Sequence, residues 1–150
     1  MFLRRFVIVS ACALFIASNA LAEDRPARDI IVGGMEQYAV SIRTMNADAS
    51  AALFTDDGEL GTVGQEPVRG REAIRAFLKS FANVKVLGDT ITVLSVDQHG
   101  SSALVKATYV QDAQVTGQPP VHVTGRLEAT WISSDGGHWL IRRMIAFPAT

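Results

Sequence analysis

Residues 38–60, YAVSIRTMNADASAALFTDDGEL, and residues 66–81, EPVRGREAIRAFLKSF, decide the fold of this 150-residue chain. Around the start of the first stretch, apolar residues recur four, three, four and three positions apart, which places them on one helical face: Ile31, Met35, Tyr38, Ile42 and Met45. The second stretch repeats such a stripe with Ile74, Phe77, Leu78 and Phe81. The spacing predicts one helix whose firm part covers 35–46 and another that opens at Gly70.

The segment between these two helices predicts a short helix, a turn and a short strand. Asn46 or Asp48 can cap a helix that runs through residues 52–54. Residues 56–58, DDG, form a turn signal, and residues 59–63 then read as a short strand.

After Asn83 the apolar period changes to two, which is typical of β-strands. Breaks such as Gly88-Asp89 interrupt or separate four runs, which cover 84–97, 101–112, 120–132 and 137–146. Gly125 falls in the apolar register of the third run and suits a bend or bulge. Helices followed by an antiparallel meander predict an α+β fold, with the helices on one face of a curved sheet.

Residues 1–22 have the pattern of an export signal. Arg4 and Arg5 precede an apolar run that is too short to span a bilayer comfortably, and residues 20–22, ALA, suit a signal peptidase. Cleavage after Ala22 predicts a periplasmic or secreted protein with a flexible leader over 23–30 and one domain over 31–150. Two alternatives stay open, a retained membrane anchor and a lipoprotein signal at Cys12. Only about five apolar residues precede Cys12, which favours conventional cleavage.

The composition of the mature chain argues against several classes of function. Cys12 is the only cysteine, so cleavage leaves no disulfide and no thiol nucleophile. Without Arg4 and Arg5, 12 basic residues stand against 15 acidic ones, a net charge of −3 without a basic patch, and we expect no nucleic-acid partner. The histidines lack the paired spacing of metal ligands, so we expect no metal or other cofactor: His99, His122 and His138. We also expect no stable membrane span after signal cleavage.

The stretch at 38–60 and the segment GREAI at 70–74 resemble the first half of SnoaL-like and ketosteroid-isomerase-like domains of the nuclear-transport-factor-2-like superfamily. The strand around Gly125, the turn at 135–137 and Trp139 also fit, so the resemblance covers 31–147. It implies a cone in which a curved antiparallel sheet wraps around three N-terminal helices and encloses an apolar pocket. It also implies a homodimer formed through the convex face of the sheet. It does not imply one function, because this superfold hosts many unrelated activities.

The catalytic groups of the best-known enzymes in this superfamily are incomplete here. Ketosteroid isomerases use a tyrosine on the first helix, which Tyr38 matches, and two aspartates. The base position falls on Thr62 or Gly61, and neither residue can take a proton from carbon. The position of the second aspartate falls among Gly125, Leu127 and Ala129. Limonene-epoxide-hydrolase-like members carry an acid on the last strand, where this chain has Arg143.

Three residues remain as catalytic candidates, namely Tyr38 with Glu59 or Asp57 as an unorthodox base. Asp57 is more typical of a turn former, whereas Glu59 can point inward from the predicted strand.

Residues assigned to inward registers form the predicted ligand pocket: Tyr38, Tyr109, Leu127, Trp131 and Arg142. Arg142 and Arg143 point to opposite faces of the last strand, so one of them faces the concave side or its rim. That arginine either fixes the carboxylate of an acidic ligand beneath Tyr38 and Trp131 or lies solvated at the rim.

The sequence therefore predicts an exported domain that binds a small apolar or amphipathic molecule without covalent chemistry. Two alternatives stay open: an enzyme of isomerase, cyclase or dehydratase type acting in the same pocket, and a structural dimer whose pocket is filled by its own side chains. An open cavity without a carboxylate favours binding, and an inward acid near Tyr38 favours catalysis.

Overall fold

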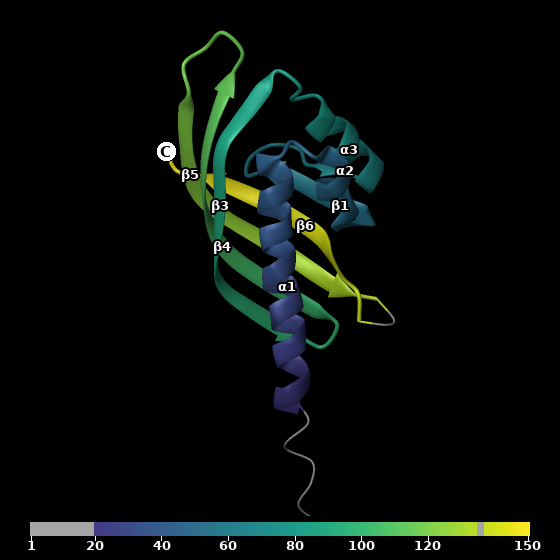
Figure 1. Ribbon diagram of the computed structural model, residues 1–150. Coiled ribbons are helices and arrows are strands. Elements are labelled where there is room, and N and C mark those ends of the chain that lie inside the picture. Colours follow the sequence, from purple (N-terminus) through teal and green to yellow (C-terminus); the bar gives the residue numbers. More distant parts are fainter. Residues whose placement is uncertain (1–19, 135–136) are drawn as a thin grey trace, which may run out of the picture.

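The computed structural model describes residues 20–134 and 137–150, with side chains described from Ala27 onward. Within these residues it contains helices and one six-stranded sheet (Figure 1). The helices are α1 (Ala20–Arg43), α2 (Ala47–Ala52) and α3 (Arg71–Lys79). In order across the sheet, the strands are β2 (Val68–Arg69), β1 (Phe54–Thr62), β6 (Trp139–Pro148), β5 (Val121–Ser133), β4 (Ser102–Val115) and β3 (Val84–His99).

The helices lie on one face of the curved sheet, and the hydrophobic core fills the space between them (Figure 1). The core joins side chains of α1, β1, α3 and the long strands, among them Ile31, Met35, Phe54, Ile74, Val105, Trp131 and Ile141. The strands from β3 to β6 pair in antiparallel fashion, whereas β1 runs parallel to β6. The predicted α+β fold, a curved sheet wrapped around N-terminal helices, is confirmed.

Helix α1 starts earlier than the sequence predicts. It begins at Ala20 and includes residues 23–30, where a flexible leader is expected, and Ala27 is already buried. Gly34 lies against the indole ring of Trp131, and a Cβ at this position would stand 2.5 Å from a ring carbon. Packing of this face therefore holds the helix together across its two glycines, against their low helix propensity.

The predicted signal peptide lies outside the described residues, except for its last three positions at the start of α1. Within the described part of the chain, no helix combines the length and the apolar character needed to cross a membrane.

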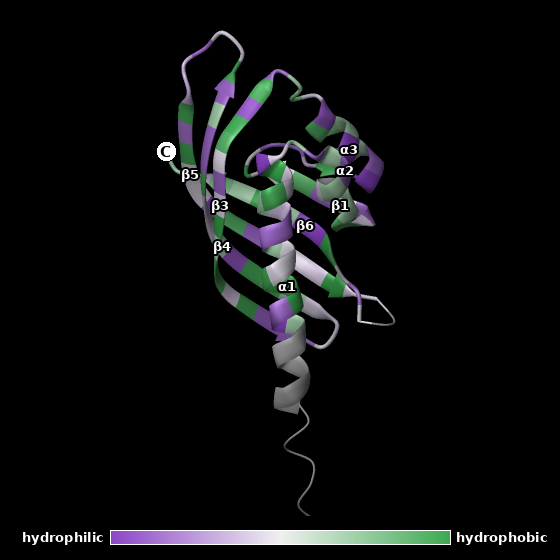
Figure 2. Cartoon of the chain, in the orientation of Figure 1, coloured by the Kyte–Doolittle hydropathy of each residue, from purple (hydrophilic) through white to green (hydrophobic). Residues whose placement is uncertain are grey.

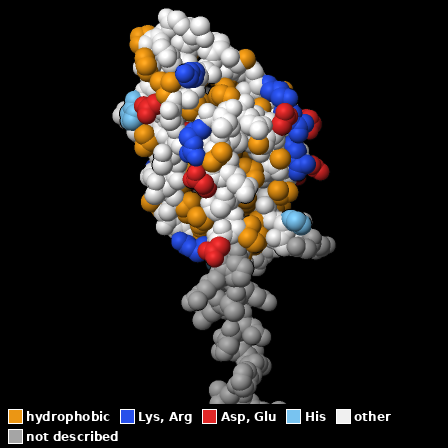
Figure 3. All heavy atoms as spheres, in the orientation of Figure 1, with side chains coloured by type: hydrophobic (Ala, Val, Ile, Leu, Met, Phe, Trp, Pro, Cys, Tyr) orange, Lys and Arg blue, Asp and Glu red, His pale blue; other side chains and the backbone are white. Residues whose placement is uncertain are grey.

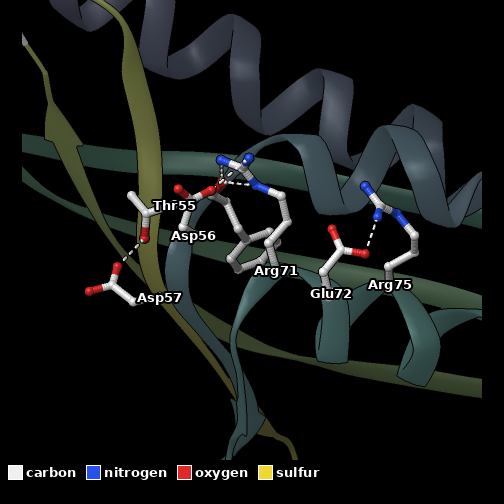
Figure 4. A network of polar contacts seen from close by, with 7 residues as sticks. Thr55, Asp56, Asp57, Arg71, Glu72 and Arg75 are labelled. Carbon is white, nitrogen blue, oxygen red and sulfur yellow. Dashed lines mark hydrogen bonds and ion pairs between the residues drawn. The ribbon is translucent and has the colours of Figure 1, made fainter.

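Residues 56–58, predicted as a turn, lie inside β1. The pairing of β1 with β6 shifts register in this part of the strand. The Thr55 hydroxyl donates a hydrogen bond to Asp57 at 2.9 Å, and Arg71 pairs with Asp56 at 2.8 Å (Figure 4). The turn prediction is wrong because a β-bulge and a turn have similar residue compositions. The extra residues of a bulge need no hydrogen-bond partner in the neighbouring strand.

The four predicted strands after Asn83 are confirmed as β3 to β6. Apolar and polar residues alternate along them (Figure 2), and the odd-numbered residues of β4 and β5 face the helices. Gly125 does not mark a bulge. A Cβ there would stand 2.8 Å from the ring of Tyr109 and would collide with the carbonyl oxygen of Phe147, so the glycine allows a close approach of three segments.

Candidate functional site

A cavity of about 490 Å³ lies between the helices and one end of the sheet. The C-terminal half of α1, the start of α2, the end of β1, α3 and the adjacent ends of β3, β4 and β5 enclose it. Most of its wall is apolar and includes Ile42, Leu60, Phe77, Leu78, Phe81 and Val86. The rings of Phe77 and Phe81 meet edge to face, with centroids 5.0 Å apart, and remain 40% and 39% exposed. An apolar concave wall of this kind is typical of ligand sites.

Charged side chains near the cavity pair with one another on the outer surface. Arg75 and Lys79 of α3 lie 2.9 and 3.2 Å from the carboxylate of Asp48. Figure 3 shows acidic and basic side chains gathered together over α3. Glu66, an acidic residue at the cavity wall, is solvent-exposed and lies 3.4 Å from Arg69.

Tyr38 lines the cavity from α1 and is only 8% exposed. Its ring meets that of Phe54 edge to face, with centroids 6.1 Å apart. Burial, together with the negative charge of Asp89, raises the pKa of the Tyr38 phenol far above its ordinary value. The hydroxyl therefore stays protonated and can donate or accept a hydrogen bond. Gly61 and Thr62, where the base of a ketosteroid isomerase is expected, line the same cavity and provide no acid.

Asp89 of β3 is a buried acid that was not foreseen from the sequence. Its side chain accepts a hydrogen bond at Oδ1 from Nε2 of Gln111, at 3.1 Å, and the residue is 6% exposed. Its Oδ2 is buried and has no hydrogen-bond partner among the described residues. Burial raises the pKa of Asp89, while the Gln111 hydrogen bond and the charge of Arg43 oppose this rise. Gln111 lines the cavity, whereas Asp89 lies directly behind it.

A β-bulge explains why the sequence pattern does not identify Asp89 as a buried residue. The sequence reads Gly88-Asp89 as a break, but β3 continues through both residues. Its register against β4 shifts between Val86 and Gly88, so Asp89 and Val86 face the same side of the sheet, toward the helices. The apolar alternation on either side of the break, with one inserted residue, was the signal that could have revealed it.

Glu59 does not line the cavity. Its carboxylate lies 3.5 Å from both Arg69 and Arg143, and its side chain is 21% exposed. The preceding register shift in β1 places Leu60, and not Glu59, at the cavity wall. The structure therefore separates this candidate base from Tyr38.

Asp57 and Arg142 form an ion pair at the surface. Arg142 also donates a hydrogen bond to the carbonyl oxygen of Asp57 at 3.0 Å. The hydrogen bond from Thr55, and then the contact with Arg142, lower the pKa of Asp57. Neither residue lines the cavity, and Arg142 pairs with Asp57 at the surface, as expected for an arginine at the rim.

The other predicted pocket residues belong to the core. Leu127 and Trp131 are 6% and 1% exposed and pack in the main hydrophobic cluster. Tyr109 is half-buried and packs against this cluster. Burial raises the pKa of Tyr109. None of these three residues lines the cavity. All three lie in the inward register, and α1 packs against Trp131 at Gly34, so this part of the cone is filled by the core.

Among the residues that the structure describes, no three His, Cys, Asp or Glu side chains lie close enough together to hold a metal ion.

Comparisons with known proteins agree on the architecture. The ketosteroid isomerase-like protein from Erwinia carotovora atroseptica has a TM-score of 0.73 at 18% identity, over 81% of this chain and 95% of that one. A nuclear transport factor 2-like superfamily protein from Salmonella enterica has a TM-score of 0.70 at 16% identity, over 82% and 91%. A protein from Catenulispora acidiphila, solved in complex with S-DNPA, has a TM-score of 0.69 at 19% identity, over 83% and 94%.

Among curated proteins, none matches the chain. The family description that does match is the SnoaL-like domain, over residues 24–145, which is most of the sequence. The structural neighbours share the fold of this chain, and one of them is a nuclear transport factor 2-like superfamily protein. By sequence and by fold, the chain belongs to the SnoaL-like domain family.

Proposed function

We propose that this domain binds a small apolar or amphipathic molecule in the cavity beside Tyr38, without covalent chemistry. One observation carries the proposal: the cavity of about 490 Å³ has a mainly apolar wall. Its volume lies within the range of roughly 300–1,000 Å³ that is typical of ligand sites. An open cavity also favours binding over a structural dimer with a filled pocket. The neighbour from Catenulispora acidiphila, solved with S-DNPA, supports the proposal at the level of the fold.

Titration calorimetry with p-cymene, a hydrocarbon, and thymol, its phenol, tests this function. Ala113→Phe adds a ring to the cavity wall on β4, and we expect it to weaken both affinities by about tenfold or more, because the added volume occupies the site. Val110→Phe adds the same ring to the exposed face of the same strand and should leave both affinities unchanged. The proposal fails if neither compound binds the wild-type protein, or if Ala113→Phe binds them equally well.

A second function, acid–base catalysis of isomerase, cyclase or dehydratase type, is favoured by Asp89. A buried acid with a raised pKa close to a protonated tyrosine is a common arrangement for proton transfer. Deuterium uptake from solvent into an enolisable ketone such as tetralone, followed by NMR, tests it. Uptake that is lost in Asp89→Asn would favour catalysis, and binding of the ketone without uptake would favour the binding function.

We propose further that the domain is exported, with cleavage after Ala22, and that it forms a homodimer. The small residues at 20–22 support the first proposal. The mass of the intact protein recovered from a periplasmic fraction tests it, because lipid attachment at Cys12 would give a longer and heavier chain. Exposed apolar side chains on the convex face of the sheet, Leu104 and Val110, support the second.

A further inference from the structure

The polar part of the cavity wall depends on one hydrogen bond between neighbouring strands. Asp89 and Gln111 lie opposite each other in the β3–β4 ladder, both on the face toward the helices. Gln111 reaches the cavity, and Asp89 holds it from behind through the bond from Nε2 to Oδ1. The carbonyl oxygen of Asp89 in turn accepts a hydrogen bond from Arg43 of α1, at 2.7 Å. The strand that carries Asp89 is thereby tied to the helix that carries Tyr38.

The chemistry of a carboxyl group decides which end of the Gln111 amide faces the ligand. An ionised carboxylate only accepts hydrogen bonds, so it turns the NH₂ group of the amide toward itself. In the structure Oδ1 of Asp89 accepts this hydrogen bond, and Oδ2 has no partner in the described chain. While Oδ1 accepts from Nε2, the acceptor that the Gln111 amide offers to the cavity is Oε1.

Three other polar side chains of the wall already make hydrogen bonds. The Ser41 hydroxyl donates to the carbonyl oxygen of Tyr38 at 2.7 Å, and Ser50 hydrogen-bonds to Ser41 at 2.6 Å. The side-chain oxygen of Asn46 accepts from the backbone N–H of Ala49 at 3.0 Å. On α1 and β4, the hydroxyl of Tyr38 and the acceptor Oε1 of Gln111 remain for a ligand. At and after the end of β1 the wall also carries Thr62 and the exposed Gln65 and Glu66.

We infer that the cavity selects an apolar molecule that carries a hydrogen-bond donor, such as an alcohol or a phenol, and that Gln111 accepts that hydrogen bond. Asp89 is the positioning residue, which acts by fixing the orientation of the amide. The inference rests on the proposed binding function. It goes further because it names the ligand class: molecules with only an acceptor, such as ethers, gain nothing from Gln111.

Three matched compounds test the inference: thymol, which has a donor, thymol methyl ether, which has only an acceptor, and p-cymene, which has neither. We expect wild-type protein to prefer thymol over its ether by about tenfold, the value of one well-placed hydrogen bond. In Gln111→Leu the preference should fall to about the ratio set by hydrophobicity alone, while the affinity for p-cymene stays within about threefold. In Asp89→Asn the preference should also fall, because asparagine can accept from or donate to Gln111 and so permits both amide orientations.

Two further variants keep the test decisive. Gln111→Leu leaves Asp89 without its donor, which can prevent folding, so the double variant Asp89→Leu, Gln111→Leu replaces both polar partners and serves in its place. Tyr38→Phe removes the phenolic hydroxyl of the wall and should keep the preference for thymol.

The outcomes separate this inference from the function on which it rests. If p-cymene and thymol both fail to bind, the proposed function itself is wrong. If p-cymene binds but the wild type does not prefer thymol, or if the preference survives in Gln111→Leu or in the double variant, the inference is wrong and the binding function stands. Loss of the preference in Tyr38→Phe alone would assign the recognition to Tyr38 and would also overturn it.

Discussion

At the scale of single residues, two adjacent glycines of α1 distinguish the effect of helix propensity on stability from the effect of core packing. A Cβ at Gly33 would meet nothing within 4 Å, whereas one at Gly34 would stand 2.5 Å from the ring of Trp131. We expect Gly33→Ala to raise the free energy of unfolding by about 0.5–1 kcal/mol, because alanine is the better helix former. Gly34→Ala should lower it by about 1–3 kcal/mol, because the methyl group overpacks the core. Urea unfolding of both variants measures the difference, and equal effects would show that Trp131 does not pack there.

Asp89 makes stability depend on pH in a defined direction. Burial raises its pKa in the folded state above the ordinary value of 3.8. Between the pKa of 3.8 in the unfolded chain and the raised pKa in the folded protein, the folded protein binds more protons than the unfolded chain. The free energy of unfolding therefore falls as the pH rises through this window. Glu36 adds to the rise, while Gln111 and Arg43 oppose it.

Asp89→Asn removes this dependence and keeps an acceptor for Gln111. We therefore expect the stability of the variant relative to wild type to increase from pH 3.5 toward pH 7, in urea unfolding at matched ionic strength. A difference that stays constant over this range would mean that Asp89 is solvated in the folded protein.

At the scale of elements, the sequence predicts most of the fold because long amphipathic patterns report burial directly. The stripe from Ile31 to Ile42 and the alternation in β5 lead to the correct element types. The sequence predictions fail where a β-bulge has the residue composition of a turn. Residues 56–58 in β1 and Gly88-Asp89 in β3 are turn-like in composition, yet both strands continue through them with a shift of register.

The short helix α2 depends on its cap. The side chain of Asn46 accepts a hydrogen bond from the backbone N–H of Ala49. Asn46 is therefore the N-cap, and it is one of the two capping residues that the sequence predicts. We expect Asn46→Ala to lower the free energy of unfolding by about 1 kcal/mol, because an N–H of the first turn loses its partner. Asn46→Ser keeps a capping oxygen and should lose only a few tenths of a kcal/mol. Thermal unfolding compares the two, and equal losses would point to packing at the cavity wall as the cause.

At the scale of the whole molecule, the register of a strand reveals which face of the sheet a residue lies on, but not its position along the depth of the cone. Leu127, Trp131 and Tyr38 all face inward, yet α1 fills the cone above Trp131 and leaves it open beside Tyr38. The crossing position of a helix over a sheet depends on contacts such as Gly34 with Trp131, which no local pattern reports. Asp89 lies near the boundary between the filled and the open part, behind Gln111.

The proposed homodimer depends on the opposite face of the same sheet. Leu104 and Val110 of β4 are 37% and 41% exposed there, and Lys106 stands opposite Glu128 of β5, so opposite charges lie between the apolar side chains. A cavity of about 320 Å³ adjoins this face between β5, β6 and the end of β1. A face with both signs of charge around apolar positions can complement itself across a twofold axis.

Leu104→Glu combined with Val110→Glu should therefore convert the dimer to a monomer, because two carboxylates per chain would be buried without partners in the interface. Ile30→Glu, at an apolar side chain of α1 that is 50% exposed, is the matched control and should leave the dimer intact. Light scattering after size-exclusion chromatography measures the mass of each variant. A monomeric wild type at about 100 µM, a concentration at which even a weak specific dimer with a Kd near 10 µM would dominate, would rule out the dimer. A dimer that survives the double substitution but is lost in Ile30→Glu would move the interface to the helical face, where it would lie on the same side of the sheet as the cavity.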